Sequence, residues 1–182
     1  MSLFPEDRPR CPEHGEPLPC FQCAKPDTLR AAREALFGAV FESGKGVDCP
    51  CCGRRVQRYK RHINSAMAAT LIWTCREFFR TQDWVPVARD GPRLAIKNRE
   101  YARLRHWGLI EAKPNADPKK RDSGFWKPTS AAYTYIRREA RLPKTKYVFK
   151  NTVLGESEET ADVVEALGKN FDYAELMDWT KP

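Results

Sequence analysis

Apolar residues recur with a helical period from Asn64 onward. Six of them fall at positions i, i+3, i+4, i+7, i+10 and i+11, which is the spacing of one buried face of an α-helix. This pattern predicts a helix of about four turns. A shorter amphipathic helix is predicted over 27–42, with Asp27 as its N-cap and Gly44 at its end. The six apolar positions are Ala68, Leu71, Ile72, Cys75, Phe78 and Phe79.

Several short elements are predicted in the segment that follows. The pattern indicates a strand over 84–87 and one helical turn over 92–96. Asn98 is the residue type that begins helices, so we expect it to cap a helix that runs to about Trp107. Gly108 is expected to end that helix, because glycine readily adopts the left-handed conformation found after the last helical turn.

Two strands with a long polar loop between them are predicted next. The strands cover 109–113 and 125–127, and the loop covers 114–124. Thr129 is expected to begin a helix that turns Ala132, Tyr135 and Ile136 inward. The last predicted elements are a hairpin over 146–155 that turns at Lys150-Asn151 and two helices over 159–167 and 173–179.

Composition limits the class of protein. The chain has 182 residues, of which 41% are hydrophobic and 31% charged, so it can bury a core and is not disordered as a whole. Neither a transmembrane segment nor a secretory leader is expected from its apolar patterning. We therefore expect a cytoplasmic, reducing location without membrane contact, where seven cysteines favour metal binding over disulfides.

The net charge of +8 is unevenly distributed. Residues 54–108 carry 13 Lys and Arg against 4 Asp and Glu, and residues 109–150 carry 11 against 4. The two ends are acidic, with net charges of −2 for 1–53 and −6 for 151–182. A basic middle favours a polyanionic partner, and the acidic end has either a screening or a docking role.

Three pairs of metal-ligand residues have two residues between their members. They are Cys11 and His14, Cys20 and Cys23, and Cys49 and Cys52. This spacing lets two side chains bind one Zn²⁺ ion, and a closed structural site needs four ligands. A region of about 50 residues with few large apolar side chains depends on such an ion for its stability.

The spacing leaves two pairings open. The first two pairs are close enough to form a compact site of three cysteines and one histidine, whereas the second and third pairs would form a four-cysteine ribbon around the 27–42 helix. The run CPEHGEPLPCFQC resembles the opening of B-box zinc fingers, although the later B-box ligands are missing. Cys75 belongs to the apolar stripe and is expected to pack in the core.

The order of the predicted elements after Asn64 resembles the winged helix-turn-helix family. The resemblance covers about residues 64–142, and its most specific part is the run LRHWGLIEAK followed by a polar loop and GFWKPT. It implies that the helix before Gly108 enters the DNA major groove and that the loop is a basic wing. The chain is thus expected to be α+β, with a structural zinc module over 1–53, a winged-helix domain over 54–155 and a short acidic helical tail over 156–182.

The whole chain also resembles small uncharacterised phage and prophage proteins. The shared features are a CPxCG knuckle, the run from YKR to MA near residue 64, the WGLIE junction and a tail like ALGKNFDYAELM. This resemblance implies a viral or prophage origin and a bacterial cytoplasm as the location. It implies no activity.

Two groups of residues are the expected DNA contacts. On the helix after Asn98, Tyr101 and Leu104 fall on the inward side, so other side chains face outward, where arginine can pair with guanine in the major groove. The tip of the wing is expected to meet the phosphate backbone or the minor groove. The predicted contacts are Asn98, Arg99, Arg103, His106, Lys119, Lys120 and Arg121.

No motif in the sequence indicates catalysis. Glycine-rich phosphate loops, HExxH zinc sites and a nucleophile with its base are all missing from the sequence. Two functions are therefore expected: a phage-encoded transcriptional regulator that binds specific double-stranded DNA, or a phage protein that binds and inhibits a host protein or defence complex. A basic run over 54–61 is either part of a phosphate track or a solvated strand.

Overall fold

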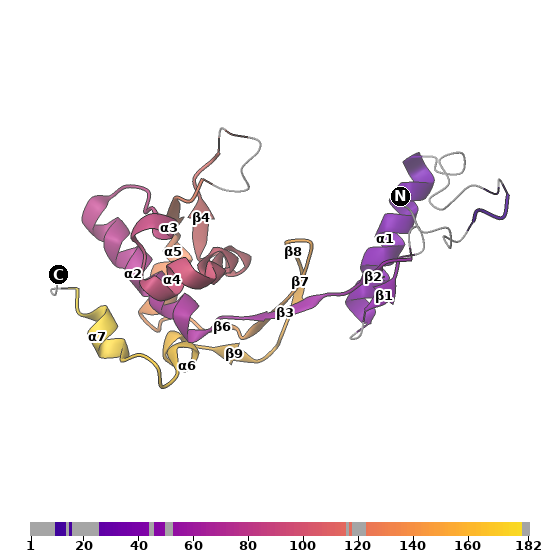
Figure 1. Cartoon of the computed structure of the whole chain (residues 1–182). Helices are drawn as coiled ribbons and strands as arrows, with labels where there is room; N and C mark the ends of the chain where they lie inside the picture. The colour runs from indigo at the N-terminus through magenta and orange to yellow at the C-terminus, as the bar shows by residue number, and fades with distance from the viewer. Residues whose placement is uncertain are drawn as a thin grey trace. The chain divides into compact units, whose positions relative to one another are not determined.

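The computed structural model describes residues 10–13, 15, 26–43, 46–49, 53–115, 117 and 123–179. The fold is α+β, with small sheets whose recorded pairings are antiparallel. The chain separates into two compact units, residues 1–59 and residues 60–182 (Figure 1). In the described part of the chain, no helix is long and apolar enough to cross a bilayer.

The first unit contains one helix and one short hairpin. Helix α1 covers Pro26–Glu42, close to the predicted range, and its Val40 is fully buried. Strands β1 (Val47–Asp48) and β2 (Arg55–Val56) pair in antiparallel register. Gly46 has a φ of +87° just before β1, and a Cβ there would lie 2.7 Å from the Val56 carbonyl oxygen. Glycine is therefore required at this position.

Helix α2 (Ser65–Thr81) is the centre of the second unit. The Asn64 side chain begins it by accepting a hydrogen bond of 2.9 Å from the Met67 N–H. The predicted stripe is confirmed at its first four positions, which are at most 1% exposed, and Phe78 is partly buried. Phe79 contradicts the prediction, because its side chain is 64% exposed. The stripe ends there because the core does not reach the last turn of α2, and the Phe79 ring instead lies 5.7 Å from that of Trp179.

Three short helical segments follow α2. They are α3 (Val87–Asp90), α4 (Arg93–Asn98) and the 3₁₀ helix η1 (Glu100–Trp107). The strand predicted over 84–87 is reduced to one bridge between Val85 and Trp126. The prediction that Asn98 caps the next helix is wrong, because Asn98 is the last residue of α4. The junction residue is Arg99, which has a φ of 49° and donates its N–H to the Ala95 carbonyl oxygen.

The junction after η1 matches the sequence prediction. Gly108 has a φ of 68°, and its N–H donates to the carbonyl oxygens of Leu104 and Arg105. Strands β4 (Ile110–Ala112) and β5 (Trp126–Pro128) then pair in antiparallel register. The Thr129 hydroxyl donates to the Gly108 carbonyl oxygen at 2.6 Å and also caps α5 (Ser130–Ile136). One residue thus holds the start of α5 against the end of η1.

The last part of the chain contributes strands and two helices to the same unit. The hairpin of β7 (Thr145–Phe149) and β8 (Thr152–Glu156) turns at Lys150 and Asn151, as predicted. Strand β3 (Tyr59–His62) lies beside β7, and β6 (Leu142–Pro143) pairs with β9 (Thr160–Ala161). The helices are α6 (Val163–Leu167) and α7 (Tyr173–Met177).

One hydrophobic core holds α2, η1, α5 and α6 together. Leu104 is 1% exposed, so the predicted inward face of the segment before Gly108 is confirmed. The predicted inward residues of α5 are also buried, and the apolar side of α6 faces the core through Val163 and Leu167, both 0% exposed. The acidic C-terminal segment is therefore packed against the rest of this unit over its described residues.

Candidate nucleic-acid interface and metal site

The predicted metal ligands are only partly within the described residues. Cys11 and Cys49 are described, whereas His14, Cys20, Cys23 and Cys52 lie outside the described residues. Cys11 is 5% exposed and Cys49 is half-buried. Among the described residues, no three His, Cys, Asp or Glu side chains come close enough together to hold a metal ion. The zinc site and its pairing therefore stay predictions.

Cys11 and Cys49 each accept a backbone hydrogen bond from a glycine four residues later. Each starts a segment of the pattern Cys-Pro-x-x-Gly. The Gly15 N–H donates to the Cys11 carbonyl oxygen at 2.8 Å, and the Gly53 N–H donates to the Cys49 carbonyl oxygen at 2.8 Å. The two glycines have φ angles of 67° and 66°, which glycine adopts without strain. The Cys49 N–H also donates to the Arg54 carbonyl oxygen at 2.9 Å, next to the β1–β2 pair.

The predicted DNA contacts on η1 differ in their surroundings. Arg99 is exposed, whereas the Arg103 side chain is 37% exposed and forms an ion pair with Glu100. His106 is half-buried. The side chain of Asn98 lies outside the described residues, and so do Lys119, Lys120 and Arg121 of the predicted wing.

Glu100 connects the start of η1 to the start of α2. One of its carboxylate oxygens accepts from Arg103, and the other accepts from the Asn64 side-chain amide at 2.7 Å. Asn64 also caps α2 through its side-chain oxygen, so both ends of that amide are used. The network fixes the direction of η1 and partly neutralises the Arg103 guanidinium.

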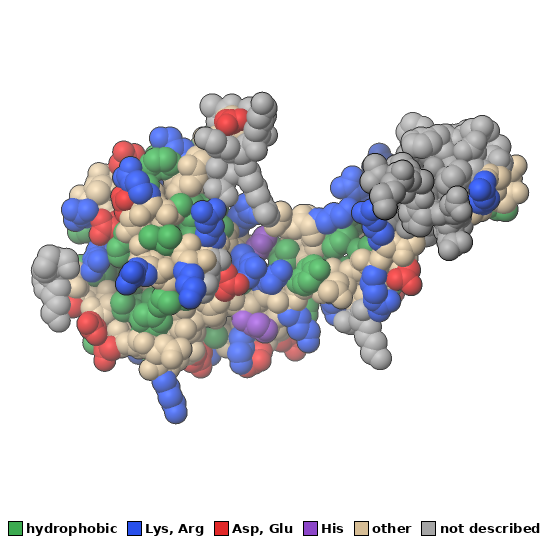
Figure 2. Space-filling model, in the orientation of Figure 1, with side chains coloured by type: hydrophobic (Ala, Val, Ile, Leu, Met, Phe, Trp, Pro, Cys, Tyr) green, Lys and Arg blue, Asp and Glu red, His purple; other side chains and the backbone are tan. Residues whose placement is uncertain are grey.

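His106 lies among positive charges from three elements. Burial lowers the pKa of its imidazole, and the nearby charges of four cations lower it further. In Figure 2, Lys or Arg side chains lie beside both of the histidine side chains that are visible. Sequence reasoning named Arg103 and included Arg61 in the basic run, but it missed the other two. The four cations are Arg105 and Arg103 of η1, Arg61 of β3 and Lys146 of β7.

The base of the predicted wing is well defined. The Lys113 N–H donates to the Phe125 carbonyl oxygen at 2.9 Å, which continues the β4–β5 ladder by one residue. The Ser123 hydroxyl donates to the Lys113 carbonyl oxygen at 2.9 Å, and the Lys113 ammonium lies 5.5 Å from the centre of the Phe125 ring. These contacts hold the two ends of the polar loop side by side.

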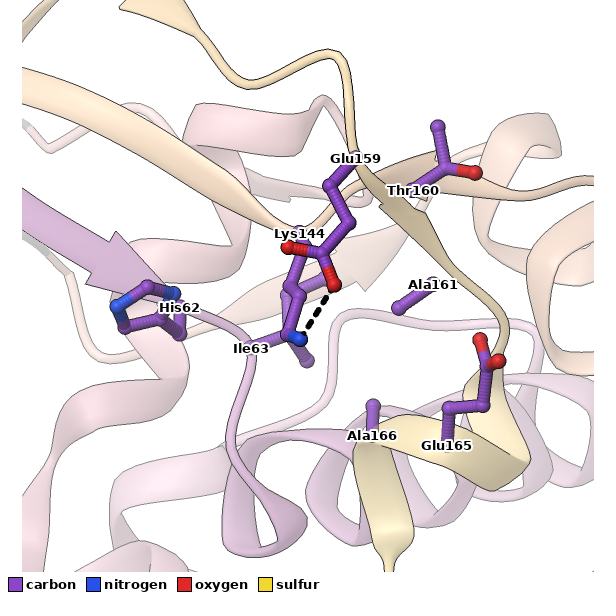
Figure 3. Close-up of a pocket in the computed structure, with 8 residues that line it drawn as sticks. All are labelled: His62, Ile63, Lys144, Glu159, Thr160, Ala161, Glu165 and Ala166. Carbon is purple, nitrogen blue, oxygen red and sulfur yellow. Dashed lines mark hydrogen bonds and ion pairs between the residues drawn. The ribbon is translucent and has the colours of Figure 1, made fainter.

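A pocket of about 280 Å³ lies between the end of β3, the β6–β9 pair and α6 (Figure 3). Lys144 and Glu159 face each other across it with an ion pair of 2.7 Å. Glu165 is paired with Arg141, and the Nδ1 atom of His62 is hydrogen-bonded to the Thr145 hydroxyl at 3.0 Å. Lys144, Glu159 and Glu165 are therefore already paired within the protein, so we interpret this pocket as a packing gap between elements and not as a ligand site.

Comparison of the chain with models of protein families, with curated protein sequences and with solved structures finds no match.

Proposed function

We propose that this chain is a non-catalytic DNA-binding regulator with a winged-helix arrangement. In this proposal η1 enters the major groove of double-stranded DNA, and the loop between β4 and β5 contacts the phosphate backbone. The observation that carries the proposal is the two-sided character of η1. Tyr101, Leu104 and Trp107 are buried, while the residues between them include Arg103 and Arg105, two of the four cations near His106.

The order of elements around η1 supports this proposal. The core brings together α2, two short helices, η1, the β4–β5 hairpin and α5, in the sequence expected of a winged helix. Fold resemblance alone does not assign a function. The charge distribution adds an independent argument, because residues 54–108 carry most of the excess Lys and Arg.

We further propose that the first unit contains a structural Zn²⁺ ion. When bound, the ion would cross-link segments that have too little apolar surface to fold alone. The spacing leaves two alternative pairings. In one, Cys11 and His14 share the ion with Cys20 and Cys23; in the other, Cys20 and Cys23 share it with Cys49 and Cys52. The matching glycine hydrogen bonds at Cys11 and Cys49 favour a third pairing. In this pairing, the two Cys-Pro-x-x-Gly segments together supply the ligands of one Zn²⁺ ion.

A second candidate function is inhibition of a host protein by direct binding. It is favoured by two exposed apolar side chains on α4, because Leu94 is 46% and Ile96 38% exposed. Figure 2 shows apolar side chains among basic ones on the visible face of the second unit. An acidic protein surface with an apolar centre would match such a face.

Binding to duplex DNA tests the proposal. We would select a preferred duplex from a random pool and then measure the affinity of the wild type, Arg99→Ala, Arg103→Ala and the triple wing variant at several salt concentrations. Loss of a base contact should cost about 1–3 kcal/mol on the preferred site and little on random DNA. Neutralising the wing should weaken binding to all sequences and flatten the salt dependence by about one unit per lost phosphate contact.

Arg80→Ala is the matched control, because Arg80 is an exposed arginine at the far end of α2. It should leave both the preferred-site affinity and the salt dependence unchanged. A wild-type protein that binds no duplex even at low salt would refute the regulator proposal. The same result would favour the host-protein candidate, which is then tested with Leu94→Asp in a pull-down from nuclease-treated host lysate.

A further inference from the structure

We propose that the four cations around His106 form a phosphate-binding site for the DNA backbone, built by β3, η1 and β7 together. This inference rests on the proposed function, which it deepens by adding Arg61, Arg105 and Lys146 to the DNA-contacting surface. The sequence placed the predicted DNA contacts on the wing and η1, and it left the basic run over 54–61, which includes Arg61, as either a phosphate track or a solvated strand. The new site places a third contact region next to η1, on strands that are distant from it in sequence.

The geometry of the two strands brings their cations together. Strands β3 and β7 are neighbours in one sheet, and the Thr145 hydroxyl lies 3.0 Å from the Nδ1 atom of His62. Successive side chains along a strand point to opposite faces of the sheet. Because His62 and Thr145 meet on one face, we infer that Arg61 and Lys146 lie on the other face. The charges of both lower the pKa of His106.

Helix η1 is attached to these strands at its C-terminal end. The Trp107 indole N–H donates to the Pro143 carbonyl oxygen at 2.7 Å, two residues before β7 begins. His106 and Arg105 precede this anchor directly. The anchor therefore keeps the cations of η1 and those of the sheet next to one another.

Two carboxylates also face this group. Glu100 of η1 is paired with Arg103, and Glu156 of β8 is paired with Lys146. These two pairs neutralise part of the positive charge at this surface. Like charges placed side by side on neighbouring strands repel each other. A row of phosphates, with one negative charge for every 1.7 Å or so of duplex, relieves that repulsion.

Phosphate binding at this surface should be coupled to protonation of His106. In the free protein, burial and the four cations keep the pKa of His106 below its ordinary value. A bound phosphate offsets the cations, so it raises the pKa of His106, and binding takes up part of one proton. Affinity for duplex should therefore increase as the pH falls through the range around the ordinary histidine pKa of about 6.5.

The test uses the full chain and a fluorescent duplex of random sequence. Affinity is measured against salt and against pH for the wild type, Arg61→Ala, Arg105→Ala and His106→Gln, with Arg80→Ala as the control. Each arginine variant should flatten the plot of log affinity against log salt by about one unit. His106→Gln should lose the increase in affinity that the wild type shows as the pH falls.

A second measurement uses only the wild-type protein, so it does not depend on whether a variant folds. The pH midpoint of the His106 ring resonances should rise when duplex is added to the wild-type protein. Salt slopes of Arg61→Ala and Arg105→Ala equal to that of Arg80→Ala would overturn the inference, and so would an unchanged His106 midpoint. If those results came with weaker binding by Arg99→Ala, the inference alone would fail. If the wild type bound no duplex, the proposed function would fail and the inference with it.

Discussion

Replacement of Leu167 by Ala tests whether the acidic C-terminal segment is part of the core. Leu167 is the last residue of α6 and is 0% exposed. The short helix is held in place by a capping box between Asp162 and Glu165 and packs against α2. If this packing is correct, Leu167 supports the whole second unit although it lies near the end of the chain.

The magnitude follows from the burial of Leu167. The substitution removes three buried carbons at about 0.8 kcal/mol each, or about 2.4 kcal/mol in total. A cavity that does not collapse adds about 24 cal/mol for each Å³, and measured Leu→Ala costs at buried sites reach about 5 kcal/mol. We therefore expect a loss of about 3–4 kcal/mol, which lowers the Tm by roughly 10–15 °C for a unit of this size.

Urea unfolding followed by tryptophan fluorescence measures this loss. All five tryptophans lie after residue 60, so the signal reports on the second unit. Leu94→Ala is the control, because Leu94 is 46% exposed and its truncation should cost less than about 1 kcal/mol. A cost for Leu167→Ala that equals that of the control would show that α6 does not belong to the core.

Three further outcomes are expected. Elemental analysis of protein that has never met a chelator should find at least one zinc per chain; Cys11→Ser and Cys49→Ser should both lower it only if the two Cys-Pro-x-x-Gly segments share an ion. Glu100→Gln should cost at most about 1 kcal/mol, because its ion pair is partly exposed, and should strengthen binding to random duplex in a salt titration, because Arg103 loses a competing carboxylate. The pKa of His106 is lowered in the folded protein, so its contribution to stability is present above about pH 6.5 and is lost as the pH falls below that value; His106→Gln should show a smaller fall in Tm between pH 7 and pH 5.

Local sequence patterns were sufficient for the elements whose structure depends on neighbours in the chain. The apolar stripe of α2 was sufficient to predict a helix, because all its residues lie in one continuous segment and repeat with the helical period. The hairpin turn at Lys150-Asn151 was predictable for the same reason, since both residues adopt the positive φ that such a turn needs. The Thr129 cap of α5 also depends on one residue and the turn that follows it.

The errors arose where tertiary contacts outweigh local preference. Asn98 is a good capping residue, yet the chain continues α4 through it and places the break at Arg99, which no capping scale favours. The cationic site around His106 depends on the pairing of β3 with β7, and the contact between His62 and Thr145 spans 83 residues. Nothing in either segment alone indicates that they meet.

Long-range contacts of this kind also limit how fast the second unit can fold. Asn170 donates to the Ser65 hydroxyl across 105 residues of chain, and the Tyr173 hydroxyl donates to the Ile136 carbonyl oxygen across 37. Closing loops of this length costs chain entropy before any contact offsets it, so folds rich in such contacts form slowly. We expect refolding over milliseconds to seconds, much slower than for a helical bundle. Until α6 docks during that interval, the part of α2 that it covers in the folded unit stays exposed to solvent.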